Sequence, residues 1–290
     1  MRSSSRALWL IAALGVGCSG ALPAPGTFED AVAFAATPDG RLWVVDGGAA
    51  AVVVLRGGFE DARLGGVGTG EGAFLDPVDV DPTNGLAIFV ADRAAGTVLQ
   101  FTDEFRLALE VVVPDVDPTR PVRQTAGAVR DGNRGQPLAV AAAPDGVLFV
   151  LDGGRRHVLQ MSSEGDVQRV LGAGLLVDPV DLALGDDGTL WVVDRGRDVV
   201  QPFDAFGSAG DALEVTGVGP LASVSVSGGG VVVGAERGVG RLRGAVIDSN
   251  PFQPLVGMIR GALEVGGRVV VLTPSGVVET DLTLRDSQLD

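Results

Sequence analysis

Acidic residues that recur at one place in the sequence are the first candidates for chemistry. Each of them ends a short apolar run, such as Leu-Trp-Val-Val-Asp at 42–46; they are Asp46, Asp92, Asp152 and Asp194. Carboxylates can hold metal ions or transfer protons. An acid that returns in every unit does the same local work each time, however. At a strand end before a tight turn, that work is to accept hydrogen bonds from backbone N–H groups. We therefore interpret all four as structural turn acids.

A position at which the units differ is the better candidate for a site. The residue two places after the expected start of each unit's first strand differs among the units. In order it is Ala33, Asp79, Ala139, Asp181, Ala222 and Arg260. Paired carboxylates near one axis could hold a hard cation such as calcium. Asp79, Asp181 and Arg260 are therefore the candidate binding residues. The alternative for both acids is a hydrogen bond to a neighbouring unit. We assign no catalytic residue and no metal ligand.

The single histidine gives little support to acid–base catalysis. His157 lies in an expected third strand away from the candidate residues, where we expect a partly exposed side chain. The sequence contains neither Gly-x-Ser-x-Gly nor His-Glu-x-x-His, and a phosphate loop would need Lys, which the chain lacks. Overlapping Gly-x-Gly runs at 66–72 precede no expected helix, which excludes a dinucleotide-binding turn.

The elements that must position these residues follow from the spacing of the acids. Successive acids are separated by 42 to 60 residues, and each unit contains several short apolar strands and an Asp-Gly or Asn-Gly turn. A period of roughly 40–45 residues of this kind indicates a β-propeller. We count six blades, all in one all-β domain at 27–290. Their first strands begin near Ala31, Pro77, Pro137, Pro179, Pro220 and Met258. A loop insertion at about 114–135 separates the second blade from the third.

The first residues of the chain resemble a bacterial lipoprotein signal. Two arginines precede an apolar run at 7–16 that is too short to span a bilayer as a helix. The run leads into Leu14-Gly15-Val16-Gly17-Cys18, and Cys18 is the only cysteine in the chain. The resemblance implies cleavage of 1–17 and lipidation of Cys18. An ordinary secretory signal is the alternative. Residues 18–26 would then form a tether, or a segment that closes the ring.

Composition limits the range of partners. The formal net charge is −15, and all 22 basic residues are Arg. Nucleic acid is excluded as a partner, because phosphate binding requires a cationic surface. The acidic surface would favour a cation or a cationic ligand if a pocket concentrates the field.

The repeated units resemble the NHL-repeat family of β-propellers over roughly residues 27–245. That family's unit runs from a proline through an Asp-Gly turn to a strand ending in Val-x-Asp, and the linker at 66–77 is similar to its glycine-rich connection. The Asn and Arg that often follow the family's Asp are replaced here, for example by Gly47 and Gly48. Similar six-bladed enzymes include calcium-dependent lactonases, which use Glu, Asn and Asp, and lyases that use His. In this chain Asn84 and Asn133 fall in turns or loops, and the place of Asn250 is open.

From these observations we expect a lipid-anchored propeller in the bacterial cell envelope, at the outer membrane and facing the periplasm or the cell surface. It would act as a non-catalytic binding or scaffold module, with another envelope protein as its partner. The first alternative is a calcium-dependent hydrolase or lactonase that uses Asp79, Asp181 and Asn250. The second is a lipoprotein that binds a small sugar or peptide without turnover. We expect no cofactor, with calcium as the candidate if one binds.

Overall fold

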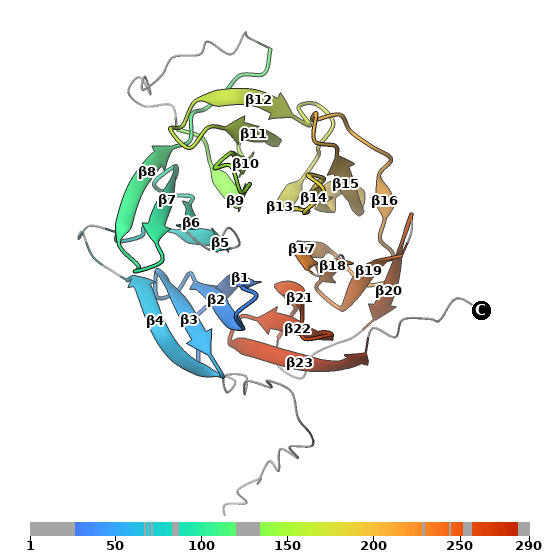
Figure 1. Cartoon of the computed structure of the whole chain (residues 1–290). Coiled ribbons are helices and arrows are strands. Elements are labelled where there is room, and N and C mark those ends of the chain that lie inside the picture. The colour runs from blue at the N-terminus through green and yellow to red at the C-terminus, as the bar shows by residue number, and fades with distance from the viewer. Residues whose placement is uncertain are drawn as a thin grey trace, which may run out of the picture.

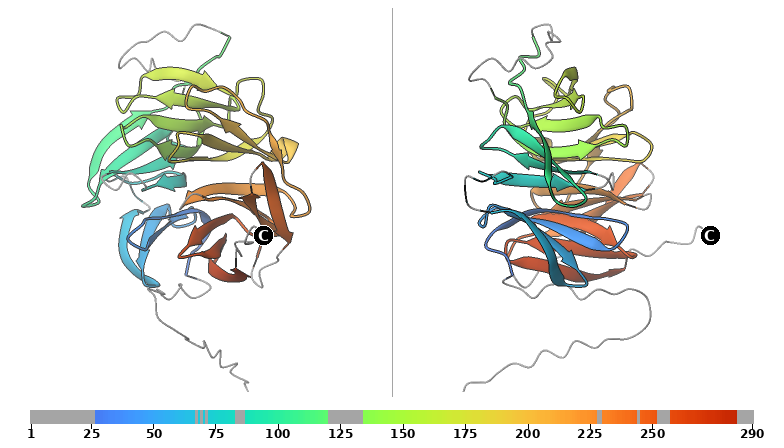
Figure 2. Two further views of the ribbon diagram at one scale, coloured as in Figure 1. Left: turned by 45° about the vertical axis from the view of Figure 1, so that its right-hand side comes forward. Right: turned by 60° about the vertical axis from the view of Figure 1, so that its left-hand side comes forward.

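The computed structural model describes residues 27–66, 68, 70, 72–82, 87–119, 134–227, 230–243, 245–251 and 257–283. Its strands form six separate antiparallel sheets arranged around one axis, as Figure 1 shows. The six-bladed β-propeller that the repeat predicts is therefore confirmed. The two views of Figure 2 show the sheets packed face to face as blades of a disc. No helix within the described ranges has the length and apolar character needed to cross a bilayer.

The strands follow the chain in order from the axis to the rim. The first blade contains β1 (Ala31–Ala36), β2 (Arg41–Asp46), β3 (Ala51–Arg56) and β4 (Phe59–Gly65). The second contains β5 (Pro77–Asp81), β6 (Ala87–Asp92), β7 (Thr97–Thr102) and β8 (Leu107–Val112). The third contains β9 (Pro137–Ala142), β10 (Leu148–Asp152), β11 (His157–Met161) and β12 (Val167–Leu171).

The other three blades are less regular. The fourth contains β13 (Pro179–Leu184), β14 (Leu190–Asp194), a 3₁₀ turn η1 (Arg195–Arg197), β15 (Val199–Phe203) and the short β16 (Leu213–Glu214). The fifth contains β17 (Leu221–Ser227), β18 (Gly230–Ala235), β19 (Gly238–Arg243) and β20 (Val246–Pro251). The sixth has three strands in the described residues, β21 (Gly261–Val265), β22 (Arg268–Thr273) and β23 (Gly276–Thr283).

The hydrophobic core is divided among the six blade-to-blade interfaces. Side chains alternate between the two faces of each strand, so every blade buries one apolar layer against each neighbour. Between the first two blades, for example, Trp43 and Val45 pack with Phe74, Val90 and Phe101. No blade can bury both of its faces alone, and the ring is therefore the smallest stable unit.

The ring closes where the first blade meets the sixth. The backbone N–H of Thr27 donates to the carbonyl of Ser275 (3.1 Å), and that of Ala31 donates to Pro274 (2.8 Å). Phe28 is buried in the same interface, against apolar side chains that include Leu263 and Leu272. The expected signal at 1–17, Cys18 and the segment 18–26 lie outside the described residues.

The expected insertion leaves the ring between β8 and β9. Pro114 pairs with Arg134 in an isolated antiparallel bridge, which brings the two ends of the insertion together. Arg155 in the β10–β11 turn makes a two-pronged salt bridge with Asp115, whose second contact, Nη2 to Oδ2, is 2.9 Å. The base of the insertion is thus fastened onto the third blade. Residues 120–133 are outside the described part.

Candidate functional site

The recurring acids end the second strand of their blades and accept backbone hydrogen bonds. Asp92 is representative: its Oδ2 accepts from the N–H of Leu75 (2.7 Å), and its Oδ1 accepts from Asp76 (3.0 Å) and Ala95 (3.1 Å). Asp46 and Asp194 make the corresponding bonds to the two residues that precede their own first strands. These carboxylates therefore fix the chain where it enters each blade.

Asp152 departs from this pattern. Its Oδ1 accepts from the N–H groups of Gln136, Gly154 and Arg155 (2.9–3.3 Å), but its buried Oδ2 has no hydrogen-bond partner within the described residues. The equivalent donor in this blade would be the N–H of Gly135, but it donates instead to the carbonyl of Val113 (2.8 Å) at the base of the insertion. A Cβ at Gly135 would lie 2.8 Å from that free oxygen, so only glycine fits there.

In the first five blades the first two strands are paired through a β-bulge, and this pairing shows which residues are equivalent around the ring. Asp79 pairs with the residue just before the turn acid of its blade, and so do Ala33, Ala139 and Asp181. In the fifth blade Leu221 pairs with Ala235, so Ala235 takes the place of the turn acid. The residue equivalent to Asp79 in this blade is therefore Ser223 and not Ala222. In the sixth blade Gly261 pairs with Leu272 and takes this place, one residue after Arg260.

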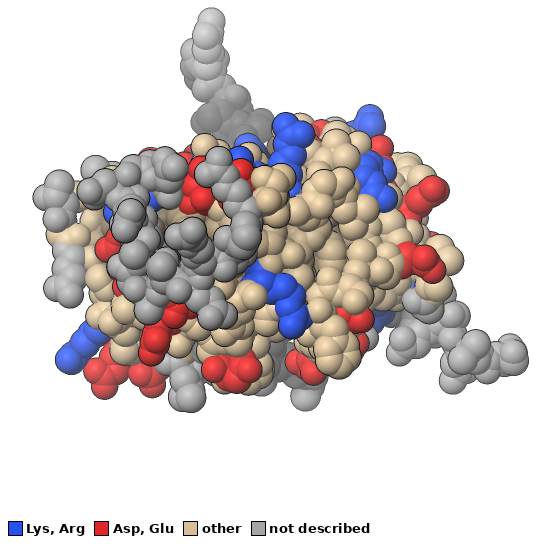
Figure 3. Space-filling view, turned by 90° about the horizontal axis from the view of Figure 1, so that it is seen from above, with Lys and Arg blue, Asp and Glu red and all other residues tan. Residues whose placement is uncertain are grey.

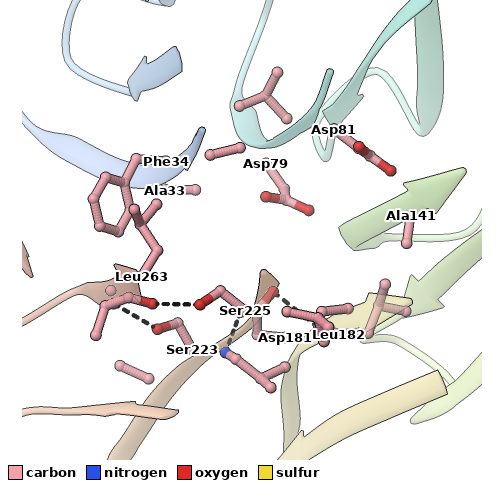
Figure 4. Close-up of a pocket in the computed structure, with 18 of the residues that line it drawn as sticks. Ala33, Phe34, Asp79, Asp81, Ala141, Asp181, Leu182, Ser223, Ser225 and Leu263 are labelled. Carbon is pink, nitrogen blue, oxygen red and sulfur yellow. Dashed lines mark hydrogen bonds between the residues drawn. The ribbon is translucent and has the colours of Figure 1, made fainter. Parts of the chain in front are cut away.

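Asp79 and Asp181 both line the central channel. They line one cavity of about 170 Å³ that is bordered by the first strands of all six blades, and the third blade lies between theirs. Figure 4 shows the two carboxyl groups at that space. Each also joins its blade to the next: Asp79 Oδ2 accepts from the N–H of Val140, and Asp181 Oδ2 accepts from that of Val224, both at 2.8 Å.

Burial in this apolar channel favours the uncharged form of both acids. Loss of solvent raises the pKa of Asp79 to about 7, although the hydrogen bonds from Val140 and Val80 oppose the shift and nearby Asp81 adds to it. Loss of solvent also raises the pKa of Asp181 well above its usual value, and the negative charge of Asp79 raises it further. The channel thus holds two carboxyl groups that resist being charged together.

Sequence reasoning missed the other polar residues of the channel. Asp81 Oδ2 accepts from the N–H of Ala142 (2.6 Å), which gives the second and third blades another bond. Ser223 Oγ accepts from the N–H of Ala262 (3.1 Å), and Ser225 donates to the carbonyl of Ala262 (3.0 Å). The strict alternation of serine and valine at 223–227 was the available signal, because it marks a strand with one polar face.

Of the remaining candidates, Arg260 borders the same cavity as the two acids, and Asn250 does not. The Arg260 side chain also lies 3.9 Å from Asp30, at the base of the first blade. Asn250 belongs to β20, the outermost strand of the fifth blade, and Asn84 and Asn133 lie outside the described residues. In the described part of the chain, no group of three or more His, Cys, Asp or Glu side chains could hold a metal ion.

His157 is in the third strand of its blade, as expected, but it is fully buried and not partly exposed. It pairs across the strands with Asp152, and neither ring nitrogen has a hydrogen-bond partner in the described residues. Burial lowers its pKa, while the charge of Asp152 opposes that shift. The expectation of partial exposure was wrong because the first residue of the third strand is buried in other blades too, where Ala51, Thr97 and Val199 hold this place.

Comparison with solved structures supports the architecture. An inactive variant of virginiamycin B lyase from Staphylococcus aureus, solved with quinupristin, is 13% identical with a TM-score of 0.62, over 88% of this chain and 81% of that one. A gluconolactonase from Xanthomonas campestris is also 13% identical, with a TM-score of 0.63 over 87% of this chain and 86% of that one. No protein-family model matches the sequence, and no curated protein does. At this identity the likeness shows the propeller fold alone.

Proposed function

We propose that this chain is an NHL-like propeller of the bacterial cell envelope, held by lipid on Cys18, that binds another envelope protein as a non-catalytic scaffold. The observation that carries the proposal is that the polar side chains of the channel are engaged in hydrogen bonds between blades. Asp79, Asp81, Asp181 and Ser223 each accept a backbone hydrogen bond from the following blade. They join the second blade to the third, the fourth to the fifth and the fifth to the sixth. This stiffens the ring, and a platform for a partner requires a stiff ring.

A calcium-dependent hydrolase or lactonase is the second candidate. It is favoured by the fold likeness to a gluconolactonase and by two carboxyl groups at one cavity. The donor set fits calcium poorly, because calcium takes six to eight oxygen ligands. Asp79 and Asp181 each already accept backbone N–H groups, and Asn250 is on the rim of the disc. A lipoprotein that binds a small ligand in the channel without turnover is the third candidate.

The anchor is tested by fractionation of cells that produce the full-length chain. We expect the wild-type protein in the membrane fraction, and a Cys18→Ala variant as an uncleaved or mislocalised precursor absent from that fraction. Ser19→Ala is the matched control, because it changes the adjacent residue and leaves the thiol in place. An unchanged membrane fraction for the cysteine variant would refute lipidation.

Binding and catalysis are separated by two assays on the mature protein. We expect calorimetric titration with calcium to show weak binding that an Asp79→Asn, Asp181→Asn double variant does not change. We also expect no hydrolysis of a panel of lactones and esters, and capture of one defined protein from envelope extract that excess soluble propeller displaces. Tight calcium binding or lactone turnover that the double variant abolishes would overturn the scaffold and establish the hydrolase.

A further inference from the structure

The turns of the propeller are divided between its two faces, because the strands of each blade run antiparallel. Turns that join the first strand to the second and the third to the fourth form what we call the hairpin face. In the described residues they are 37–40, 57–58, 82, 103–106, 143–147, 162–166, 185–189, 204–212, 245 and 266–267.

The opposite face, which we call the connection face, holds the turns from second to third strands and the segments between blades. Its described residues are 27–30, 47–50, 66, 68, 70, 72–76, 93–96, 113–119, 134–136, 153–156, 172–178, 195–198, 215–220, 236–237, 257–260 and 274–275.

The hairpin face is strongly acidic. Its described turns contain one basic residue, Arg106, beside a large set of acids: Asp39, Asp103, Glu104, Asp145, Glu164, Asp166, Asp186, Asp187, Asp204 and Asp211. Four further arginines begin or end strands next to these turns, Arg41, Arg56, Arg243 and Arg268, and acids remain in excess when they are included. Figure 3 views the disc edge-on: acidic side chains are more frequent along its lower rim, and acidic and Arg side chains are mixed along its upper rim. A face of this charge is repelled by anionic lipid headgroups.

The connection face carries balanced charge. Its described arginines are Arg93, Arg134, Arg155, Arg156, Arg195, Arg197, Arg237 and Arg260. Its acids are Glu29, Asp30, Asp76, Asp115, Asp117, Asp178, Asp198 and Glu236. Several of them pair locally, such as Arg93 with Asp76 (2.7 Å) and Arg195 with Asp178 (2.8 Å). This face therefore offers no net repulsion to an anionic surface.

Exposed apolar side chains also stand on the connection face, close to the axis. Leu75, Val177 and Met258 are 69%, 47% and 51% exposed. They lie at the entrances to the second, fourth and sixth blades, so they are spread around the channel mouth. Apolar side chains beside Arg are the composition that enters the headgroup region of a bilayer. The exposed apolar side chains at the hairpin face are Phe59, Phe206 and Val246, which lie at turns between the outer two strands of their blades, near acids of that face.

The chain enters the fold on this same face. Thr27 is hydrogen-bonded to Ser275 in the β22–β23 turn, which belongs to the connection face. If Cys18 is the lipidated end, the segment between the lipid and Thr27 consists of the nine residues 18–26. Such a length extends to at most about 30 Å. A lipid on Cys18 would therefore hold the connection face, and not the hairpin face, near the membrane.

We infer that the connection face rests against the lipid surface, with the acidic hairpin face directed away from the bilayer. The inference depends on the lipid anchor of the proposed function and adds an orientation to it. Leu75, Val177 and Met258 enter the headgroup region, and the arginines around them lie beside lipid phosphates. A protein partner that approaches from the aqueous side then meets the hairpin face.

Site-specific fluorophores on the full-length lipidated protein test this orientation. Cys18 is the only cysteine, and lipidation occupies its thiol, so an introduced cysteine is the only free thiol. Labels at Val177→Cys and Met258→Cys report the connection face, and matched labels at Phe59→Cys and Phe206→Cys report the hairpin face. The vesicles contain phosphatidylethanolamine, phosphatidylglycerol and a lipid with a nitroxide on its headgroup. We expect several-fold stronger quenching of the connection-face labels.

Flotation of the vesicles separates the two ways in which this can fail. A protein that does not float with the vesicles overturns the anchor, and the orientation with it. A protein that floats but shows equal quenching on both faces, or stronger quenching on the hairpin face, overturns the orientation alone. A Leu75→Glu, Val177→Glu variant labelled at position 258 should still float but lose most of the quenching. Unchanged quenching in that variant would also contradict the contact.

Discussion

His157 lies directly across the β10–β11 pair from Asp152, and both side chains are fully buried. The equivalent pairs in other blades place Ala51, Thr97 or Val199 opposite the turn acid. Only at the third blade, within the described residues, does the turn acid also keep an unpartnered oxygen. The N–H of Gly135 donates instead to Val113 at the base of the insertion, so a buried carboxylate oxygen and a buried imidazole without hydrogen-bond partners in the described residues lie together here.

A buried neutral His157 should make the fold sensitive to acid. Its pKa is lowered by burial from 6.5, so as the pH falls through about 6.5 the unfolded chain binds this proton before the folded chain does. The free energy of unfolding should therefore decrease with falling pH. His157→Val, which copies Val199, should reduce that decrease in denaturant titrations between about pH 8 and pH 5. An identical pH dependence in the two proteins would show that the histidine is charged, or accessible to water, in the fold.

The channel acids should act in the opposite direction. The pKa of Asp79 is raised from 3.8 to about 7, so its contribution to stability is complete below 3.8 and is lost as the pH rises through about 7. Asp79→Asn keeps an acceptor for the N–H of Val140 and removes the charge. The variant should gain stability relative to wild type near pH 8 and none near pH 4. A variant that is less stable at both pH values would mean that the carboxylate is charged and favourable in the channel.

Replacement of single turn acids should cost similar amounts of stability. Asp46→Ala, Asp92→Ala and Asp194→Ala each leave buried backbone N–H groups without an acceptor, which costs about 1–3 kcal/mol. The three sites belong to different blades, so the losses should add in a triple variant. Chemical denaturation measures each value. One acid whose replacement abolishes partner binding at unchanged stability would contradict a purely structural role.

Gly234 should not tolerate a side chain. A Cβ there would lie 2.5 Å from Ser223 Oγ and 2.8 Å from the backbone nitrogen of Ala262, at the contact between the fifth and sixth blades. Gly234→Ala should therefore lower the melting temperature by several degrees. Gly217→Ala is a control with free space around its Cβ and a cost limited to its positive φ. Equal stability of Gly234→Ala and wild type would show that these two blades are separable.

The repeat could be predicted from the sequence because each blade carries the same local sequence signals at similar spacing. Asp-Gly turns and a strand-ending acid recur, and each is a local interaction that residues close in sequence determine. The expected alignment of the fifth blade with the others was wrong, because it also relied on such local signals. Glu236 preserves the acidic character at nearly the right place, yet Ala235 holds the equivalent pairing position. The alignment on Pro220 consequently hid Ser223, which is the counterpart of Asp181.

Side-chain environment could not be predicted to the same degree, because it depends on contacts between distant segments. His157 was expected to be partly exposed, but its place at the start of the third strand is buried against other parts of the ring, as it is for Thr97 and Val199. Asp79 and Asp181 were recognised because they interrupt a series of alanines. Their bonds to the following blades involve partners 61 and 43 residues away, and no sequence spacing identifies such partners.

The closure of the ring has a mechanical consequence. Thr27 and Ala31 join the first blade to the β22–β23 turn through two backbone hydrogen bonds, and Phe28 fills the interface between them. Any load applied through the N-terminal segment meets these contacts before it reaches a blade. They lie one after another along the chain, so a pulling force breaks them in turn rather than together. Under tension the propeller should therefore peel open at this seam, while the hydrogen bonds within its sheets still hold.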